Sequence, residues 1–183
     1  VIKKSTFTYV RQKQMLGLGH AILTGKPLIG NEPFAVILAD DLCDCNEKSV
    51  ISQMIEIYSQ HQCSVVAIEE VPMNQTHKYG VIAGKLVKNS INTYQVSDMV
   101  EKPKEKDAPS NMAIIGRYIL TPDIFNILEN IKPDKSGEIQ ITDALNIQAK
   151  QGKVVAYKFK GKRFDCGSVK GYLEANNYFA KNL

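Results

Sequence analysis

Several patterns by which enzymes are commonly recognised are missing from this sequence. It contains no dinucleotide-binding glycine fingerprint, no Walker loop, no serine nucleophile elbow and no His-Glu-x-x-His helix. Each of these patterns sets a reactive group or a phosphate-binding backbone in the geometry that its reaction requires. Their absence argues against hydride transfer, P-loop chemistry, serine hydrolysis and zinc proteolysis.

Long apolar runs and cysteine pairs are scarce as well. No window approaches the length of a transmembrane helix and no signal peptide is visible, so we expect no membrane partner. The cysteines Cys43, Cys45, Cys63 and Cys166 lack the spacing of two zinc-binding pairs, and we interpret them as reduced thiols. A cytoplasmic protein is the expectation that follows.

The composition is otherwise that of a globular protein. The 183 residues are 44% hydrophobic and 23% charged, which predicts one domain, residues 1–183, with a sizeable core. The net charge of +4 is mild and the lysines are dispersed along the chain. Nucleic acid is therefore not expected as a partner.

The most informative stretch, Phe34–Asp41, is an apolar run that ends in two carboxylates. Its length and β-branched content predict a strand buried on both faces, as in a parallel sheet. Ligands of open α/β sheets bind beyond the carboxyl ends of such strands, where Asp40 and Asp41 would emerge. Carboxylates there suit Mg²⁺ and hence phosphates, whereas the alternative is that they only cap the strand or begin a turn.

Strands and helices alternate along the rest of the chain. Further strands are predicted at residues 6–11, 64–68, 79–84, 93–100, 112–120 and 154–159. A turn is predicted at 42–47, and helices are predicted to begin near residues 17, 49, 121, 137 and 169. This order predicts an α/β fold with a mixed, mostly parallel sheet flanked by helices.

A few polar residues have side chains suited to a nucleotide sugar. Gln12 offers a donor and an acceptor, which matches the edge of a pyrimidine, and Gly17 and Gly19 allow close backbone approach. Glu101 can accept two sugar hydroxyls, and Lys102 can pair with a phosphate. Taken singly, the glycines fit an ordinary strand-to-helix connection better than a ligand site, and Glu101 and Lys102 fit a surface ion pair better.

Seven motifs in one order are far more specific than any of them alone. They are Gln12–Ala21, Val36–Asp41, Tyr79–Val81, Val100–Pro103, Ala108–Tyr118, Gly137–Ala144 and Asp165–Gly167. With these motifs the chain resembles the sugar-1-phosphate nucleotidylyltransferases over essentially its whole length. Three short matches favour the uridylyl-transferring members over their thymidylyl-transferring relatives. They are Gly-His-Ala, Ser-Asn and Asp-Cys-Gly.

The resemblance implies a Rossmann-like nucleotidyltransferase fold and a defined reaction. In the family, an oxygen of glucose 1-phosphate attacks the α-phosphorus of UTP in line, giving UDP-glucose and pyrophosphate, with Mg²⁺ as cofactor. The resemblance implies that Asp40 and Asp165 hold the metal and that Asp40 and Lys102 are catalytic. It also implies a homo-oligomer acting in carbohydrate metabolism.

The resemblance implies further roles at the two ends of the substrate. Gln12 and Gly17 would bind the uracil edge of the nucleotide. Gly80 would let the backbone approach the glucose, Glu101 would hold its hydroxyls, and Lys102 would contact the sugar phosphate.

The sequence departs from the family at its front. The family begins with a strand and a Gly-x-Gly-Thr-Arg-x-x-Pro-x-Thr-Lys loop, which wraps the triphosphate and supplies a catalytic arginine. This sequence contains neither, and the sequence around Arg11 and Arg117 does not match that loop, so they would not replace the arginine. We expect an N-terminally truncated chain, the C-terminal two-thirds of such an enzyme, lacking the first βα units. Such a piece should expose apolar sheet and an unpaired strand edge, and should have little activity alone.

Two other functions are compatible with these residues. A non-catalytic fragment or remnant that binds nucleotide sugars would share every residue with the enzyme. A metal-dependent glycosyltransferase also places acids after a strand, but such enzymes usually carry Asp-x-Asp, whereas this chain has Asp40-Asp41 with Asp44 further on.

Overall fold

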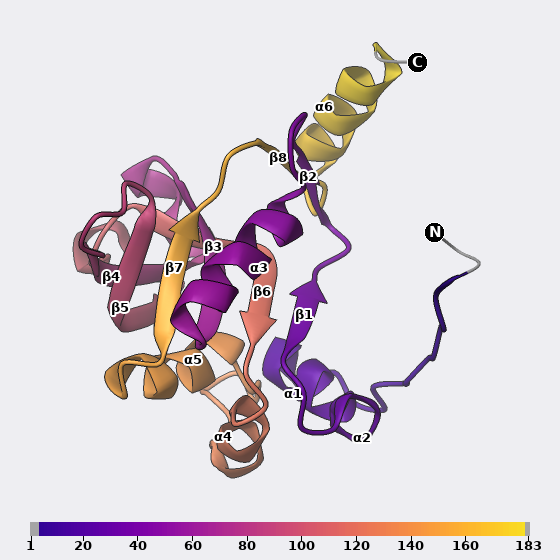
Figure 1. Ribbon diagram of the computed structural model, residues 1–183, viewed down its shortest axis with the longest axis vertical. Helices are drawn as coiled ribbons and strands as arrows, with labels where there is room; N and C mark the ends of the chain where they lie inside the picture. The colour runs from indigo at the N-terminus through magenta and orange to yellow at the C-terminus, as the bar shows by residue number, and fades with distance from the viewer. Residues whose placement is uncertain (1–3, 182–183) are drawn as a thin grey trace.

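A six-stranded mixed sheet forms the centre of the computed structural model, which describes residues 4–181 (Figure 1). Across the sheet the strands are β1 (Phe34–Ile37), β6 (Met112–Leu120), β3 (Ser64–Glu70), β7 (Val154–Lys158), β5 (Thr93–Glu101) and β4 (Gly80–Leu86). The mixed sheet confirms the predicted α/β class.

The expectation of a mostly parallel sheet is wrong for the pairing of neighbouring strands. Of the hydrogen-bonded pairs in the six-stranded sheet, β3–β7 is parallel, and β1–β6, β3–β6, β5–β7, β4–β5 and β4–β6 are antiparallel. The reason is the direction of two strands. Strand β6 lies between β1 and β3, β5 lies between β7 and β4, and each runs opposite to both of these neighbours. Apolar content alone does not reveal strand direction, because a buried antiparallel strand has the same composition as a parallel one.

Helices cover both faces of the sheet, and β3 shows how. Its side chains alternate between the faces, as a period of two residues requires. Val65 and Ala67 pack with Met54 of α3 (Val50–His61). Val66 and Ile68 belong to the core on the opposite face. That second core also holds side chains from α1 (Gly17–Thr24), α4 (Ile124–Asn130) and α5 (Ile141–Lys150), with α2 (Lys26–Ile29) beside it.

Strand β1 is not buried on both faces, which corrects the first expectation from the sequence. Phe34 and Val36 are half-buried, while Ala35 and Ile37 are exposed. Phe34 stacks on Phe125 at 5.0 Å between ring centroids, so only one face of the strand meets a core. The strand lies at the end of the sheet and pairs with β6 alone among the described strands, which agrees with the expected unpaired apolar edge.

A two-stranded ribbon and the last helix stand apart from the main sheet (Figure 1). The ribbon joins β2 (Asp41–Asp44) to β8 (Lys162–Asp165), and α6 (Val169–Ala180) packs against it through Phe164. The turn expected at 42–47 is therefore wrong, because β2 finds its partner more than a hundred residues away. The strand expected at 6–11 is also wrong, because those residues are irregular and exposed.

The remaining elements follow the sequence closely. Two short helical turns, η2 (Met73–Lys78) and η3 (Glu105–Asp107), flank the β4–β5 hairpin. Helix α5 begins at Ile141 rather than at Gly137, because residues 134–140 form a hydrogen-bonded loop in front of it. None of the helices within residues 4–181 combines the length and the hydrophobicity needed to cross a membrane.

Candidate functional site

A cavity of about 460 Å³ brings together motifs that are far apart in the sequence. Its walls come from the starts of α1, β4 and α5, the ends of β1, β5 and β8, and the middle of β6. The lining includes six of the seven residues to which the sequence analysis gives a role: Gly17, Asp40, Gly80, Glu101, Lys102 and Asp165. The chain therefore places these side chains around one space.

The seventh residue, Gln12, lies behind the glycine turn. Its amide Nε2 donates to the carbonyl of Gly17 at 3.2 Å and lies 2.9 Å from Nδ1 of His20. Gly17 has a φ of +87°, and a Cβ there would lie 2.9 Å from Cβ of Glu138. The turn thus requires glycine because the Glu138–Ile139 segment packs directly on it, with Ile139 N donating to the carbonyl of Leu16 at 2.8 Å.

The carboxylate of Glu101 is held by a buried hydroxyl. Thr142 Oγ1, in the first turn of α5, donates to Glu101 Oε2 at 2.6 Å. A Cβ on Gly80 would lie 2.9 Å from Thr142 Oγ1 and 3.1 Å from Glu101 Oε2. Gly80 therefore leaves room for the Glu101–Thr142 hydrogen bond. This is a second reason for glycine here, beside the expected approach of the backbone to a sugar.

Lys102 has an unusual backbone conformation for a residue with a side chain. Its φ is +45°, and its N–H donates to the carbonyl of Tyr79 at 3.0 Å. A non-glycine residue in this region is held there by its surroundings, and such residues gather at functional sites. The ammonium lies 3.8 Å from Glu101 Oε1, and more than half of the side chain is exposed.

Asp40 and Asp165 approach each other where β1 and β8 end. The N–H of Cys166 donates to the carbonyl of Asp40 at 2.7 Å, which ties the two segments together. A Cβ on Gly167 would lie 3.2 Å from Asp40 Oδ2 and 3.2 Å from Asp165 Oδ1. The two carboxylate oxygens therefore converge on one point, which a Cβ at position 167 would crowd.

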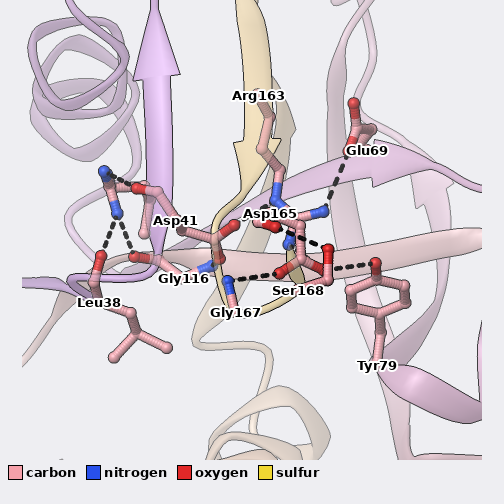
Figure 2. A network of polar contacts seen from close by, with 10 residues as sticks. Leu38, Asp41, Glu69, Tyr79, Gly116, Arg163, Asp165, Gly167 and Ser168 are labelled. Atoms are coloured by element: carbon pink, nitrogen blue, oxygen red, sulfur yellow. Dashed lines mark hydrogen bonds and ion pairs between the residues drawn. The ribbon is translucent and has the colours of Figure 1, made fainter. Parts of the chain in front are cut away.

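Asp41 follows Asp40 in the sequence, but its carboxylate is bonded to other groups of the protein (Figure 2). It is buried, its Oδ2 accepts from the N–H of Gly116 at 2.5 Å, and its Oδ1 accepts from Nε of Arg163. Its carbonyl accepts from the guanidinium of Arg117. Both carboxylate oxygens are thus used inside the protein, and the adjacent acids Asp40 and Asp41 do not act as a pair.

Arg163 is the residue of the site that sequence reasoning missed. Its side chain is 8% exposed and pairs with Asp41, Glu69 and Asp165. Burial by itself lowers the pKa of Arg163, but the hydrogen bond and charge of Asp41 more than offset this, so that the pKa is raised. The one signal in the sequence was its position two residues before Asp165, in Arg-Phe-Asp-Cys-Gly. A buried arginine needs an acid nearby, and this position could have suggested that Arg163 lies beside the carboxylates.

The carboxylates of Asp40 and Asp165 form a donor set that suits Mg²⁺. Within residues 4–181, no three His, Cys, Asp or Glu side chains gather closely enough to enclose a metal ion. Mg²⁺ is usually held by one or two carboxylates and keeps its other positions for water and phosphate oxygens. Two hard oxygens beside a cavity therefore fit this metal, and not a closed structural site of the kind that zinc prefers.

Comparison with known proteins shows the family to which the chain belongs. Residues 2–182 match the family model described as nucleotidyl transferase. A UTP–glucose-1-phosphate uridylyltransferase of Pseudomonas aeruginosa is 62% identical over 184 residues, covering 100% of this chain and 65% of the relative. One from Staphylococcus epidermidis is 45% identical, covering 94% of this chain and 59% of the relative. The chain thus spans less than two-thirds of the length of these curated relatives.

Solved structures of similar proteins have the same fold. A UDP-glucose pyrophosphorylase complexed with UDP-glucose has a TM-score of 0.95 at 62% identity, covering 100% of this chain and 69% of that one. A UTP-bound UGPase from Acinetobacter baumannii has a TM-score of 0.82 at 38% identity, covering 93% of this chain and 58% of that one. These matches confirm the predicted nucleotidyltransferase fold.

Proposed function

Because this chain belongs to the nucleotidyl transferase family, we propose that the protein transfers a uridylyl group from UTP to glucose 1-phosphate. UDP-glucose and pyrophosphate are the products. The observation that carries this proposal is the single cavity lined by Gly17, Gly80, Glu101 and Lys102 together with the carboxylate pair. The relatives' names give the choice of UTP and glucose over other nucleotides and sugars.

The uracil end of the substrate would lie at the glycine turn. Gln12 donates to the carbonyl of Gly17 and so steadies the turn, and Gly17 lines the cavity. A uracil edge offers carbonyl acceptors and an N–H donor, which backbone and amide groups complement. Discrimination against other bases would come from this edge, because a site built to hydrogen-bond one pattern rejects analogues that leave its groups unpaired.

The sugar end would lie on the opposite side of the cavity. Glu101 would accept hydrogen bonds from glucose hydroxyls, and Thr142 keeps its carboxylate oriented. Lys102 would bind the sugar phosphate through its exposed ammonium. Positioning of this kind supplies much of the rate in a reaction that needs no covalent enzyme intermediate.

Asp40 and Asp165 would hold Mg²⁺ between these two ends. When bound, the ion would neutralise phosphate charge and stabilise the charge that moves toward pyrophosphate. The residues of the chain itself bring the attacking oxygen of glucose 1-phosphate in line with the α-phosphorus of UTP. As that bond forms, the bond to the β-phosphate oxygen breaks, and Lys102 offsets negative charge on the attacking side.

The experiment that tests this proposal measures pyrophosphate release by the full-length gene product. UTP with glucose 1-phosphate and Mg²⁺ should give stoichiometric pyrophosphate and UDP-glucose. dTTP, ATP and galactose 1-phosphate, tested in parallel, should be poorer substrates. Release that does not depend on glucose 1-phosphate, or a preference for another nucleotide, would contradict the assignment.

A second candidate is binding of nucleotide sugars by residues 1–183 without turnover. It is favoured by the engagement of both buried arginines near the cavity, Arg163 with Asp41 and Arg117 with the backbone carbonyls of Leu38 and Gly116. Neither is available to a triphosphate. UDP-glucose binding measured by calorimetry on residues 1–183, with no pyrophosphate formed from UTP, would support this candidate over catalysis by these residues alone.

We also propose that the protein is a homo-oligomer of the cytoplasm and that residues 1–183 form one domain. The resemblance to the sugar-1-phosphate nucleotidylyltransferases supports assembly. Light scattering on the full-length gene product tests the oligomeric state, and a monomer at micromolar concentration would contradict it.

A further inference from the structure

Arg163 connects four parts of the structure that surround the carboxylate pair. It lies on β8, two residues before Asp165, and pairs with Asp41 of β2 and with Glu69 of β3 at 3.5 Å. Its guanidinium also lies 5.3 Å from the ring centroid of Tyr79. Figure 2 shows this side chain between Asp41 and Glu69, with Tyr79 and Asp165 beside it. A planar guanidinium can bind several partners at once in fixed directions, which an ammonium cannot do.

Two groups hold the same oxygen of Asp165. Nη2 of Arg163 lies 3.7 Å from Asp165 Oδ2, and the hydroxyl of Tyr79 donates to that atom at 3.2 Å. The other oxygen, Oδ1, is the one that converges with Asp40 on the point above Gly167. Oδ1 itself accepts from the N–H of Gly167 at 3.2 Å, so the contacts on Oδ2 and this backbone bond together set the direction in which Oδ1 points.

We propose that Arg163 and Tyr79 are positioning residues that together orient Asp165 for a divalent cation. We call these two residues the Asp165 clamp. This inference rests on the proposed function, because it assumes that Asp40 and Asp165 bind the metal. It adds two residues of the cavity wall that contact Asp165 and are not themselves metal ligands.

The clamp predicts an effect that a merely neutralising arginine would not have. Arg163→Lys keeps the positive charge beside Asp41 but loses the fork that reaches Asp165. Groups that orient metal ligands typically change metal affinity by about tenfold or more. If Arg163 only balanced the charge of Asp41, the lysine variant would bind the cation as well as the unchanged protein does.

The test is Mn²⁺ binding to the full-length gene product, followed by the electron paramagnetic resonance signal of free Mn²⁺. We expect Arg163→Lys to weaken Mn²⁺ binding about tenfold. The matched control is Arg11→Lys, since Arg11 is exposed and should leave binding unchanged. A folded Arg163→Lys variant with unchanged Mn²⁺ affinity overturns the inference, even if its thermal stability is lower.

Tyr79→Phe tests the clamp without disturbing the buried pair of Arg163 and Asp41. Loss of its hydrogen bond to Asp165 should weaken Mn²⁺ binding by roughly threefold to tenfold. This variant decides the question if Arg163→Lys does not fold. In the double variant the loss should be smaller than the product of the single losses, because both groups act on Asp165 Oδ2.

UDP-glucose binding separates this inference from the proposed function. An unchanged protein that binds neither Mn²⁺ nor UDP-glucose contradicts both. A protein that binds both, with clamp variants that bind Mn²⁺ equally well, overturns the clamp and leaves the proposed function intact. A protein that binds UDP-glucose but not Mn²⁺ overturns the clamp and the metal site together.

Discussion

At the scale of single residues, small and buried groups determine how the exposed polar side chains are held. Thr142 is 4% exposed and donates to Glu101, and Gly80 leaves the space in which that bond forms. The hydroxyl does not look functional in the sequence, and Gly80 was expected only to let the backbone approach the glucose. Both matter because a carboxylate that binds sugar hydroxyls must already point toward them.

Thr142→Val should raise the KM for glucose 1-phosphate with a smaller change in kcat. Valine has nearly the same shape but lacks the donor, and a hydrogen bond to a charged group contributes about 1.5–3 kcal/mol. The expected increase in KM is therefore roughly tenfold or more. Steady-state kinetics of the full-length gene product measures it, with Thr142→Ser as the control that keeps the hydroxyl. An unchanged KM in the valine variant would show that Glu101 needs no such support.

At the scale of elements, similar stretches of sequence acquire different surroundings. Phe34–Leu38 and Ser64–Ile68 are both short apolar runs, and both form strands. Strand β3 lies between β6 and β7 and is buried on both faces, whereas β1 has β6 alone beside it and is half exposed. Local composition predicts the strand, but its neighbours come from distant parts of the chain and decide its burial.

Helix α3 begins at a cap that the sequence does predict. Ser49 Oγ accepts from the N–H of Ser52 at 3.2 Å, and the helix then buries Met54 against the sheet. Ser49→Ala should lower the free energy of unfolding by about 1 kcal/mol, because an N–H at the helix start loses its acceptor. Urea unfolding measures the change. The control is Ser59→Ala inside the same helix, which should destabilise less or not at all.

The loop before α5 gives a prediction for acid conditions. Asp134 accepts hydrogen bonds from Ser136, Glu138 and Gln140, and the Ser136 and Gln140 bonds are the main reason that its pKa lies well below 3.8. A depressed carboxyl pKa stabilises the folded state above the unfolded value. That contribution is lost as the pH falls from about 3.8 toward the lower folded value.

Asp134→Asn should therefore reduce this acid dependence. The difference in unfolding midpoint between the unchanged protein and the variant should be largest at pH 5 and should shrink as the pH falls below 3.8. Urea unfolding at a series of pH values measures it, with Asp107→Asn on an exposed turn as the control. A difference that stays constant with pH would mean that the loop does not depend on the charge of Asp134.

At the scale of the whole molecule, the cavity is assembled from motifs distributed over most of the chain. Resemblance to the family predicted which residues would meet, and the structure lines one cavity with all of them except Gln12, which lies behind the turn. Residue patterns did not reveal Arg163, because its contact with Asp41 joins positions 122 residues apart. Nor did they reveal the pairing of β2 with β8, since two short polar strands have no apolar period to detect.

Tyr79 connects Lys102, at the sugar end of the cavity, to the carboxylate pair. Its carbonyl accepts the N–H of Lys102, and its hydroxyl holds Asp165. A shift of Tyr79 on binding of the sugar phosphate would therefore reach Asp165 as well. Thermodynamic reciprocity then requires that UDP-glucose raise the affinity for Mn²⁺ by the same factor by which Mn²⁺ raises the affinity for UDP-glucose. The protein would thus bind its two ligands as a cooperative pair, and Tyr79→Phe would make them more nearly independent.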